Sequence, residues 1–145
     1  MIQIVPMAAQ HLKTLAEIER QCFRAPWSAE SLGEELGNQD HLFLVAEENG
    51  TALGYVGCQT VLDEGYITNV AVSPKARRRG IARMLLNQLS ARAKEKGLAF
   101  ITLEVRQSNA AAIALYEGQG YCEVGVRKGF YSNPKEDAVL MTKYF

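Results

Sequence analysis

The chain has 145 residues, of which 48% are hydrophobic and 22% are charged. These values are those of an ordinary soluble globular protein, and the length fits one domain over residues 1–145 with a core of its own. The 16 basic and 16 acidic side chains balance, so no overall attraction to nucleic acid or to a membrane is expected.

Few residues of the kind that form disulfides or bind metals are present. Cys22, Cys58 and Cys122 are odd in number and are not spaced as metal ligands, which predicts a reduced protein without a metal site. The first six residues lack the basic and long apolar regions of a signal peptide. No apolar run approaches the roughly 20 residues of a membrane span. We therefore expect a cytoplasmic protein.

The first third of the chain predicts a strand followed by two helices. Residues 2–5 favour a strand, which ends at Pro6. Residues 8–23 place apolar side chains at helical spacing and predict an amphipathic helix. Ser28 is a typical N-cap for a second, short helix that ends near Gly37.

A run of strands comes next. Residues 41–47 are rich in strand formers, and Asn49-Gly50 is the strongest two-residue hairpin signal. Residues 52–62 then return as the partner strand, and residues 65–72 form a third. These segments predict an antiparallel meander.

The second half of the chain alternates helices and strands. A helix is predicted from Gly80 to Lys96, and Gly97 follows it where a glycine commonly ends a helix. The later segments are a strand at 98–105, a helix at 109–117, and strands at 121–126 and 137–144. A meander combined with a strand–helix–strand crossover predicts a mixed α/β sheet.

Basic residues crowd the start of the helix that opens at Gly80, namely Lys75, Arg77, Arg78, Arg79 and Arg83. A helix N-terminus carries about +0.5 of an elementary charge and free N–H groups, so cations are unfavourable there unless an anion binds. Gly80 would let a ligand approach the backbone closely. A phosphate or pyrophosphate held by backbone amides explains the arrangement. The alternative is a solvated basic patch that contacts RNA. Neither a Walker A loop nor a G-x-G-x-x-G motif is present.

A carboxylate interrupts the apolar strand predicted at 98–105. Glu104 shares one face of this strand with Arg106, while Leu103 and Val105 face the other way. Partial desolvation would raise the pKa of Glu104 and its strength as a base. A structural ion pair with Arg106 is the alternative interpretation.

In the helix that follows, Asn109 and Tyr116 are seven positions apart and share one face. Each also has a structural interpretation: Asn109 could be an N-cap, and Tyr116 could be a core aromatic residue.

The segment Asn69–Val72, then Pro74 and Arg77-x-x-Gly80-x-Ala82, resembles the acetyl-CoA motif of the GNAT acetyltransferase superfamily. Amides of this loop bind the CoA pyrophosphate in that family, and the preceding strand binds pantetheine and the acetyl carbonyl. The resemblance implies acetyl-CoA as cosubstrate, with no metal. The positions that it implicates are Val70, Ala71, Val72, Arg78, Arg79, Gly80, Ile81, Ala82 and Arg83.

The run from Leu103 to Glu117 is similar to a bacterial branch of the superfamily that acetylates the N-terminal alanine of a small-subunit ribosomal protein, the eighteenth. The similarity extends over nearly the whole chain and departs at Gly118-Gln119 and across residues 31–40. It implies a GNAT fold of the α/β (α+β) class, with a mixed, mostly antiparallel seven-stranded sheet flanked by about four helices. It also implies a monomer whose partner is the ribosomal protein, without direct contact to nucleic acid or membrane.

The resemblance implies roles for three residues. Glu104 would be the base that accepts a proton from the attacking α-amine through a water, and Tyr116 would protonate the CoA thiolate. Asn109 would bond to pantetheine. Trp27 and Tyr131 are expected to line the peptide groove because amphipathic aromatic side chains line binding sites, although simple packing of Trp27 is an open alternative. Two other functions remain open: a GNAT enzyme for small amines or lysine side chains, and a noncatalytic module that binds CoA or RNA.

Overall fold

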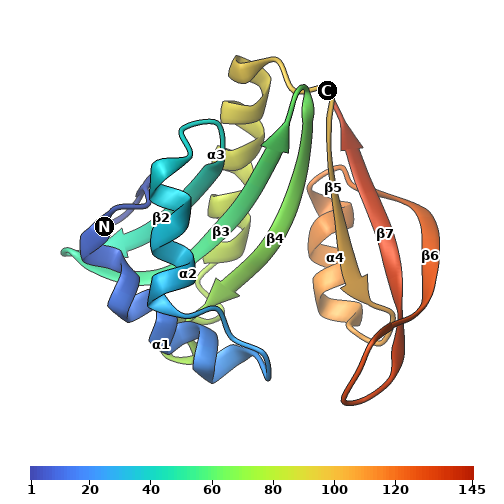
Figure 1. Cartoon of the computed structure of the whole chain (residues 1–145), viewed down its shortest axis with the longest axis horizontal. Coiled ribbons are helices and arrows are strands. Elements are labelled where there is room, and N and C mark those ends of the chain that lie inside the picture. Colours follow the sequence, from blue (N-terminus) through green and yellow to red (C-terminus); the bar gives the residue numbers. More distant parts are fainter.

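A computed structural model describes residues 1–145 as one seven-stranded sheet with helices on both faces (Figure 1). The strands are β1 (Ile2–Pro6), β2 (Leu42–Glu48), β3 (Thr51–Val61), β4 (Glu64–Val72), β5 (Phe100–Arg106), β6 (Cys122–Tyr131) and β7 (Glu136–Tyr144). The α-helices are α1 (Leu12–Cys22), α2 (Ala29–Glu34), α3 (Ile81–Lys96) and α4 (Ala110–Gly118). The predicted fold class is confirmed.

Local sequence signals account for several element boundaries. Ser28 Oγ accepts the backbone N–H of Ser31 at 3.1 Å and caps α2 as predicted. Asn49 and Gly50 both have positive φ, at 52° and 81°, which the tight β2–β3 hairpin requires. Other boundaries differ by a few residues, and the largest difference is at β6, which runs on to Tyr131, past the predicted end at residue 126. Most side chains of this edge strand are exposed, so it lacks the apolar alternation that marks a half-buried strand.

The strand order along the sheet is β1-β2-β3-β4-β5-β7-β6. All neighbouring pairs are antiparallel except β4 and β5, which are parallel because α3 connects them as a crossover. The β4–β5 pairing covers only residues 64–66 of β4 and residues 100–102 of β5. Beyond these residues the two strands diverge, as Figure 1 shows for the arrows labelled β4 and β5. The divergence leaves one edge of β4 unpaired in the middle of the sheet.

Two apolar clusters lie on the two faces of the sheet. The larger packs α3 and α4 against one face and includes Leu85, Leu89 and Tyr116, while the smaller packs α1 and α2 against the other face and includes Leu15 and Leu32. Side chains on β4 therefore point either toward α3 and α4 or toward α1 and α2. None of the helices combines the length and the apolar character that a membrane crossing requires.

Candidate active site

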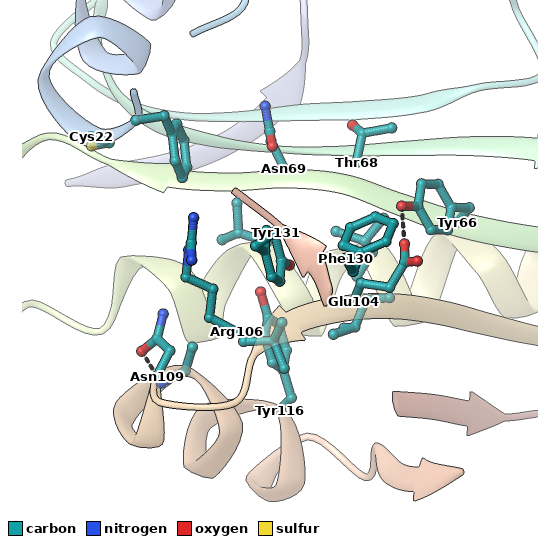
Figure 2. Close-up of a pocket in the computed structure, with 16 residues that line it drawn as sticks. Cys22, Tyr66, Thr68, Asn69, Glu104, Arg106, Asn109, Tyr116, Phe130 and Tyr131 are labelled. Atoms are coloured by element: carbon teal, nitrogen blue, oxygen red, sulfur yellow. Dashed lines mark hydrogen bonds between the residues drawn. The ribbon is translucent and has the colours of Figure 1, made fainter. Parts of the chain in front are cut away.

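A cavity of about 450 Å³ opens where β4 and β5 diverge (Figure 2). β4, β5 and α4 form its sides, and the ends of α1 and β6 contribute the remaining wall. Five of the residues predicted for the site line this one cavity: Val70, Glu104, Asn109, Tyr116 and Tyr131. The structure thus brings together residues that are up to 61 positions apart in the sequence, from Val70 to Tyr131.

Glu104 is held in this cavity by two polar partners. Its side chain is only 5% exposed, and its Oε2 atom lies 3.1 Å from Arg127 Nε. The hydroxyl of Tyr66 donates to the other carboxylate oxygen. The flanking residues Leu103 and Val105 are buried on the opposite face of β5, as the strand alternation predicted. The carboxylate is therefore largely desolvated and kept in one orientation.

The alternative interpretation, a structural ion pair between Glu104 and Arg106, is not what the structure shows. Arg106 instead donates to Glu136 Oε1 at 3.2 Å and to the carbonyl of Ser132 at 3.1 Å. Its long side chain extends toward the connection between β6 and β7, and its guanidinium stacks 4.5 Å from the ring centroid of Tyr131. Arg106 therefore orders the wall that carries Tyr131.

Sequence reasoning missed both partners of Glu104. Tyr66 lies on β4, which neighbours β5. Arg127 lies on β6, which is separated from β5 by β7. Burial, together with the hydrogen bond to the Glu104 carboxylate, raises the pKa of Tyr66 above its ordinary value. Its hydroxyl accordingly stays protonated and donates to Glu104. No local pattern could have identified these partners, because the contacts depend on the strand order.

Tyr116 belongs both to the core and to the cavity. Its side chain is 8% exposed, and its ring meets that of Tyr121 edge-on at a centroid distance of 5.8 Å. Burial, and secondarily the nearby Tyr131, raises the pKa of Tyr116 to about 12. No protein group hydrogen-bonds to its hydroxyl, although the residue lines the cavity. The hydroxyl therefore remains protonated at neutral pH and is available to a ligand.

Asn109 likewise has two roles that are compatible. Its Oδ1 atom accepts the N–H of Ala112 at 3.1 Å, so Asn109 is the N-cap of α4. The cap uses only the oxygen of the amide. The NH2 group has no protein acceptor, and Asn109 lines the cavity, where the NH2 group can donate to a ligand.

A second hollow, of about 440 Å³, lies at the N-terminus of α3. Its lining includes Val72, Arg78, Gly80, Ile81, Ala82 and Arg83, all predicted cofactor contacts. Arg78 and Gly80 have positive φ, at 67° and 74°, and no side chain caps the first turn of α3. No carboxylate pairs with Arg78 or Arg83. Free N–H groups and unpaired guanidinium groups thus share one hollow, which suits a phosphate group.

Two of the predicted cofactor contacts have side chains that are already engaged within the protein. The Arg79 guanidinium makes a bidentate ion pair with Glu48, with N···O distances of 3.1 and 2.8 Å. This contact holds the pKa of Glu48 below its ordinary value. The side chain of Ala71 is buried in the cluster beneath α1 and α2. The Arg79 guanidinium is thus already paired within the protein, unlike those of Arg78 and Arg83.

Trp27 lies apart from the cavity. It lines a separate hollow of about 340 Å³ beside α2 with Glu34 and Glu35. Its ring packs on Phe43 at a centroid distance of 6.3 Å, and its backbone N–H donates to Glu19 Oε1 at 2.9 Å. The structure does not bring Trp27 to the cavity that Tyr131 lines. Trp27 therefore packs against the smaller apolar cluster, as the alternative interpretation held.

Residues 12–121 match the sequence model of the acetyltransferase (GNAT) family, and the chain belongs to this family. It is 40% identical over 144 residues to the ribosomal protein bS18-alanine N-acetyltransferase of Haemophilus influenzae, with 97% of each chain covered. The crystal structure of the ribosomal-protein-S18-alanine N-acetyltransferase from Escherichia coli superimposes with a TM-score of 0.91 and 34% identity, covering 99% of this chain and 94% of that one.

A more distant structural relative bears on the cosubstrate. Arabidopsis thaliana NAA60 was solved in complex with acetyl-CoA, and it matches this fold with a TM-score of 0.90 and 22% identity over 100% of both chains. At that identity the likeness concerns the fold alone. The fold of this chain is thus one that has been observed with acetyl-CoA bound in another protein.

Proposed function

We propose that this protein transfers the acetyl group of acetyl-CoA to the α-amine of the N-terminal alanine of ribosomal protein bS18. The observation that carries the proposal is the single cavity between β4 and β5, in which a desolvated carboxylate and a protonated tyrosine hydroxyl both reach the same space. The similarity to bS18-alanine N-acetyltransferases over nearly the full chain supports the choice of substrate. The proposal includes a cytoplasmic, single-domain monomer that works without a metal.

Acetyl-CoA would bind across the two hollows. Its pyrophosphate would lie at the start of α3, where first-turn amides, Arg78 and Arg83 offer donors and positive charge. The pantetheine arm would follow the unpaired edge of β4 at residues 70–72 and accept a hydrogen bond from the Asn109 amide. A backbone N–H on this edge would stabilise the charge that develops on the thioester oxygen.

The proposed reaction is direct attack of the α-amine on the acetyl carbonyl. A peptide α-amine has a pKa of about 8, so a useful fraction of it is already neutral near that pH. Its nitrogen becomes strongly acidic as the C–N bond forms, and a carboxylate can take the proton at that stage. Glu104 would take that proton through a water as the C–N bond forms and the C–S bond breaks. The CoA sulfur leaves with the electron pair of the broken bond, and Tyr116 would supply its proton. The products are an acetylated N-terminus and CoA.

A thiol-release assay tests the proposal directly. With acetyl-CoA and a peptide that begins with alanine and contains an internal lysine, we expect CoA to appear much faster with the protein than without it. The matched peptide with a blocked α-amine should give no release above background. Release that persists with the blocked peptide would assign lysine side chains as the substrate. No release from either peptide between pH 7 and 9 would exclude the enzymatic proposal.

The rate of the reaction should rise with pH and then level off, without a fall at high pH. We expect kcat/KM for the peptide to rise up to about pH 8, where the α-amine becomes neutral. It should then stay level to about pH 10, because a Tyr116 pKa of about 12 keeps the proposed acid protonated over that range. Initial rates with subsaturating peptide and saturating acetyl-CoA give the profile. A fall in kcat/KM between pH 8 and 10 would contradict the role of Tyr116.

Gly80 provides a test of the phosphate hollow. Its φ is 74°, and no atom lies within 4 Å of a Cβ added there, so Gly80→Ala should cost about 1 kcal/mol of stability through backbone strain alone. The new methyl group would project where the pyrophosphate is proposed to approach the backbone. We expect the KM for acetyl-CoA to rise roughly tenfold, which is about 1.4 kcal/mol of binding, with kcat little changed.

Gly97 at the other end of α3 is a matched control. It has a φ of 78° and equally open surroundings, but it lies outside both hollows. Gly97→Ala should lose the same stability and keep the wild-type KM for acetyl-CoA. Equal KM values for the two variants would remove the start of α3 from the proposed cofactor site.

A further inference from the structure

A carboxylate outside the proposed catalytic pair is fully buried beside the cavity. Glu19 on α1 is 0% exposed and has no cationic partner. Its Oε2 atom accepts the Tyr55 hydroxyl at 2.7 Å and Asn69 Nδ2 at 3.0 Å, and Oε1 accepts the Trp27 N–H. Burial is the larger effect and raises the pKa of Glu19 above its ordinary value, although these three donors act in the opposite direction. A buried carboxylate is costly unless donors satisfy it, so the three donors fix its position.

This network orients the amide of Asn69. Nδ2 donates to Glu19 Oε2 and also lies 3.3 Å from the Tyr55 hydroxyl oxygen, so the NH2 group of Asn69 faces the Glu19–Tyr55 pair beneath α1. The amide oxygen must then point the other way. Figure 2 shows the nitrogen of Asn69 on the α1 side and its oxygen on the cavity side. No protein group donates to this oxygen, and Asn69 lines the cavity.

A β-bulge places Asn69 on this face of the sheet. β3 and β4 pair as Gly57 with Asn69 and as Cys58 with Ile67, which leaves Thr68 as the extra residue. In a regular strand, Asn69 would share the face of Ile67, which packs in the cluster under α3 and α4. The bulge shifts the alternation by one residue and turns Asn69 toward α1 instead. Glu104 projects from β5 into the same cavity, opposite β4.

We propose that Asn69 Oδ1 accepts one N–H of the attacking α-amine, and that Glu19 is the positioning residue that holds this acceptor in place. The proposal rests on the proposed function. A neutral primary amine has two N–H bonds and one lone pair, and attack requires the lone pair to face the thioester carbon. With one N–H directed to Asn69 on β4 and the other toward Glu104 on β5, the lone pair is left to point between the two strands. The site would then select primary over secondary amines.

The test compares two peptides that differ by one N–H, one beginning with alanine and one with N-methylalanine. We expect the wild-type protein to prefer the primary amine in kcat/KM. Asn69→Ala should lower kcat/KM for the alanine peptide by roughly 10- to 100-fold, the scale of a hydrogen bond in a desolvated site. It should leave the N-methylalanine peptide nearly unaffected, so the preference disappears. The KM for acetyl-CoA should not change.

Tyr55→Phe is the matched control, because it removes another donor to Glu19 and does not line the cavity. Asn69 keeps its bond to Glu19 in that variant, so the preference for the primary amine should persist. Asn69→Ser also removes the amide oxygen from the cavity, but it keeps a polar side chain and so disturbs the packing less. It should show the same loss of preference as Asn69→Ala. Thermal unfolding of each variant checks that the protein is folded.

Three outcomes separate the possibilities. An undiminished preference for the primary amine in Asn69→Ala and Asn69→Ser would overturn the inference. Equal loss of the preference in Tyr55→Phe would also overturn it, because the effect would then come from the buried network as a whole. A wild-type protein inactive on the alanine peptide would instead refute the function on which the inference rests.

Discussion

We expect Glu104→Gln to lower kcat by roughly 100-fold or more, the usual contribution of a general base. The amide is nearly isosteric with the carboxylate and can still accept the Tyr66 hydroxyl, but it cannot take a proton from the amine. The phosphate hollow lies at the start of α3, away from this substitution, so acetyl-CoA should bind as in the wild type. Single-turnover acetylation separates the chemical step from cosubstrate binding.

Glu136→Gln provides a control with similar chemistry. Glu136 on β7 also pairs with an arginine, Arg106, at 3.2 Å, but it does not line the cavity. Its substitution should weaken an ion pair and leave most of the turnover. If Glu104→Gln turned over as fast as the wild type, the Glu104 carboxylate would serve only to hold Tyr66 and Arg127.

The second large effect is expected at Tyr116. Tyr116→Phe should slow thioester cleavage by roughly 100-fold, because the leaving thiolate loses its proton donor. The fold should tolerate the change, since the hydroxyl has no partner in the protein and the ring contact with Tyr121 remains. Rapid-quench measurement of CoA release at saturating substrates reports this step.

Tyr121→Phe is the matched control for Tyr116→Phe, because it removes the other hydroxyl of the same ring pair. The Tyr121 hydroxyl is buried without any hydrogen-bond partner, and Tyr121 does not line the cavity. Removing an unsatisfied buried hydroxyl should leave turnover unchanged and stability equal or higher. A wild-type rate in Tyr116→Phe would make Tyr116 a packing residue like its neighbour.

Local signals in the sequence predicted what depends on near neighbours. The Ser28 cap, the Asn49-Gly50 hairpin and the Gly97 helix end each involve residues within about four positions of one another. The burial of Leu103 and Val105 on the face opposite Glu104 was also predicted, because successive side chains of a strand point to opposite faces. Together with the apolar periodicity of each segment, such local signals predicted every strand and α-helix in the correct order.

Contacts across the sheet were not predictable in the same way. Arg127 reaches Glu104 only because β6 lies at the edge of the sheet outside β7, so spacing in the sequence suggested Arg106 instead. Glu19 appeared to be an ordinary polar residue of α1, yet its side-chain donors are 36 and 50 positions away. The β4 bulge that turns Asn69 toward α1 has no signal in the local sequence.

The proposed function depends first on the binding of acetyl-CoA, because every proposed step requires the acyl carrier between β4 and β5. The decisive measurement is a calorimetric titration of the intact protein with acetyl-CoA at low salt. We expect saturable binding of one acetyl-CoA per chain that weakens as salt rises, since Arg78 and Arg83 contribute charge at the start of α3. Titrations without heat or saturation at any salt concentration would contradict the account.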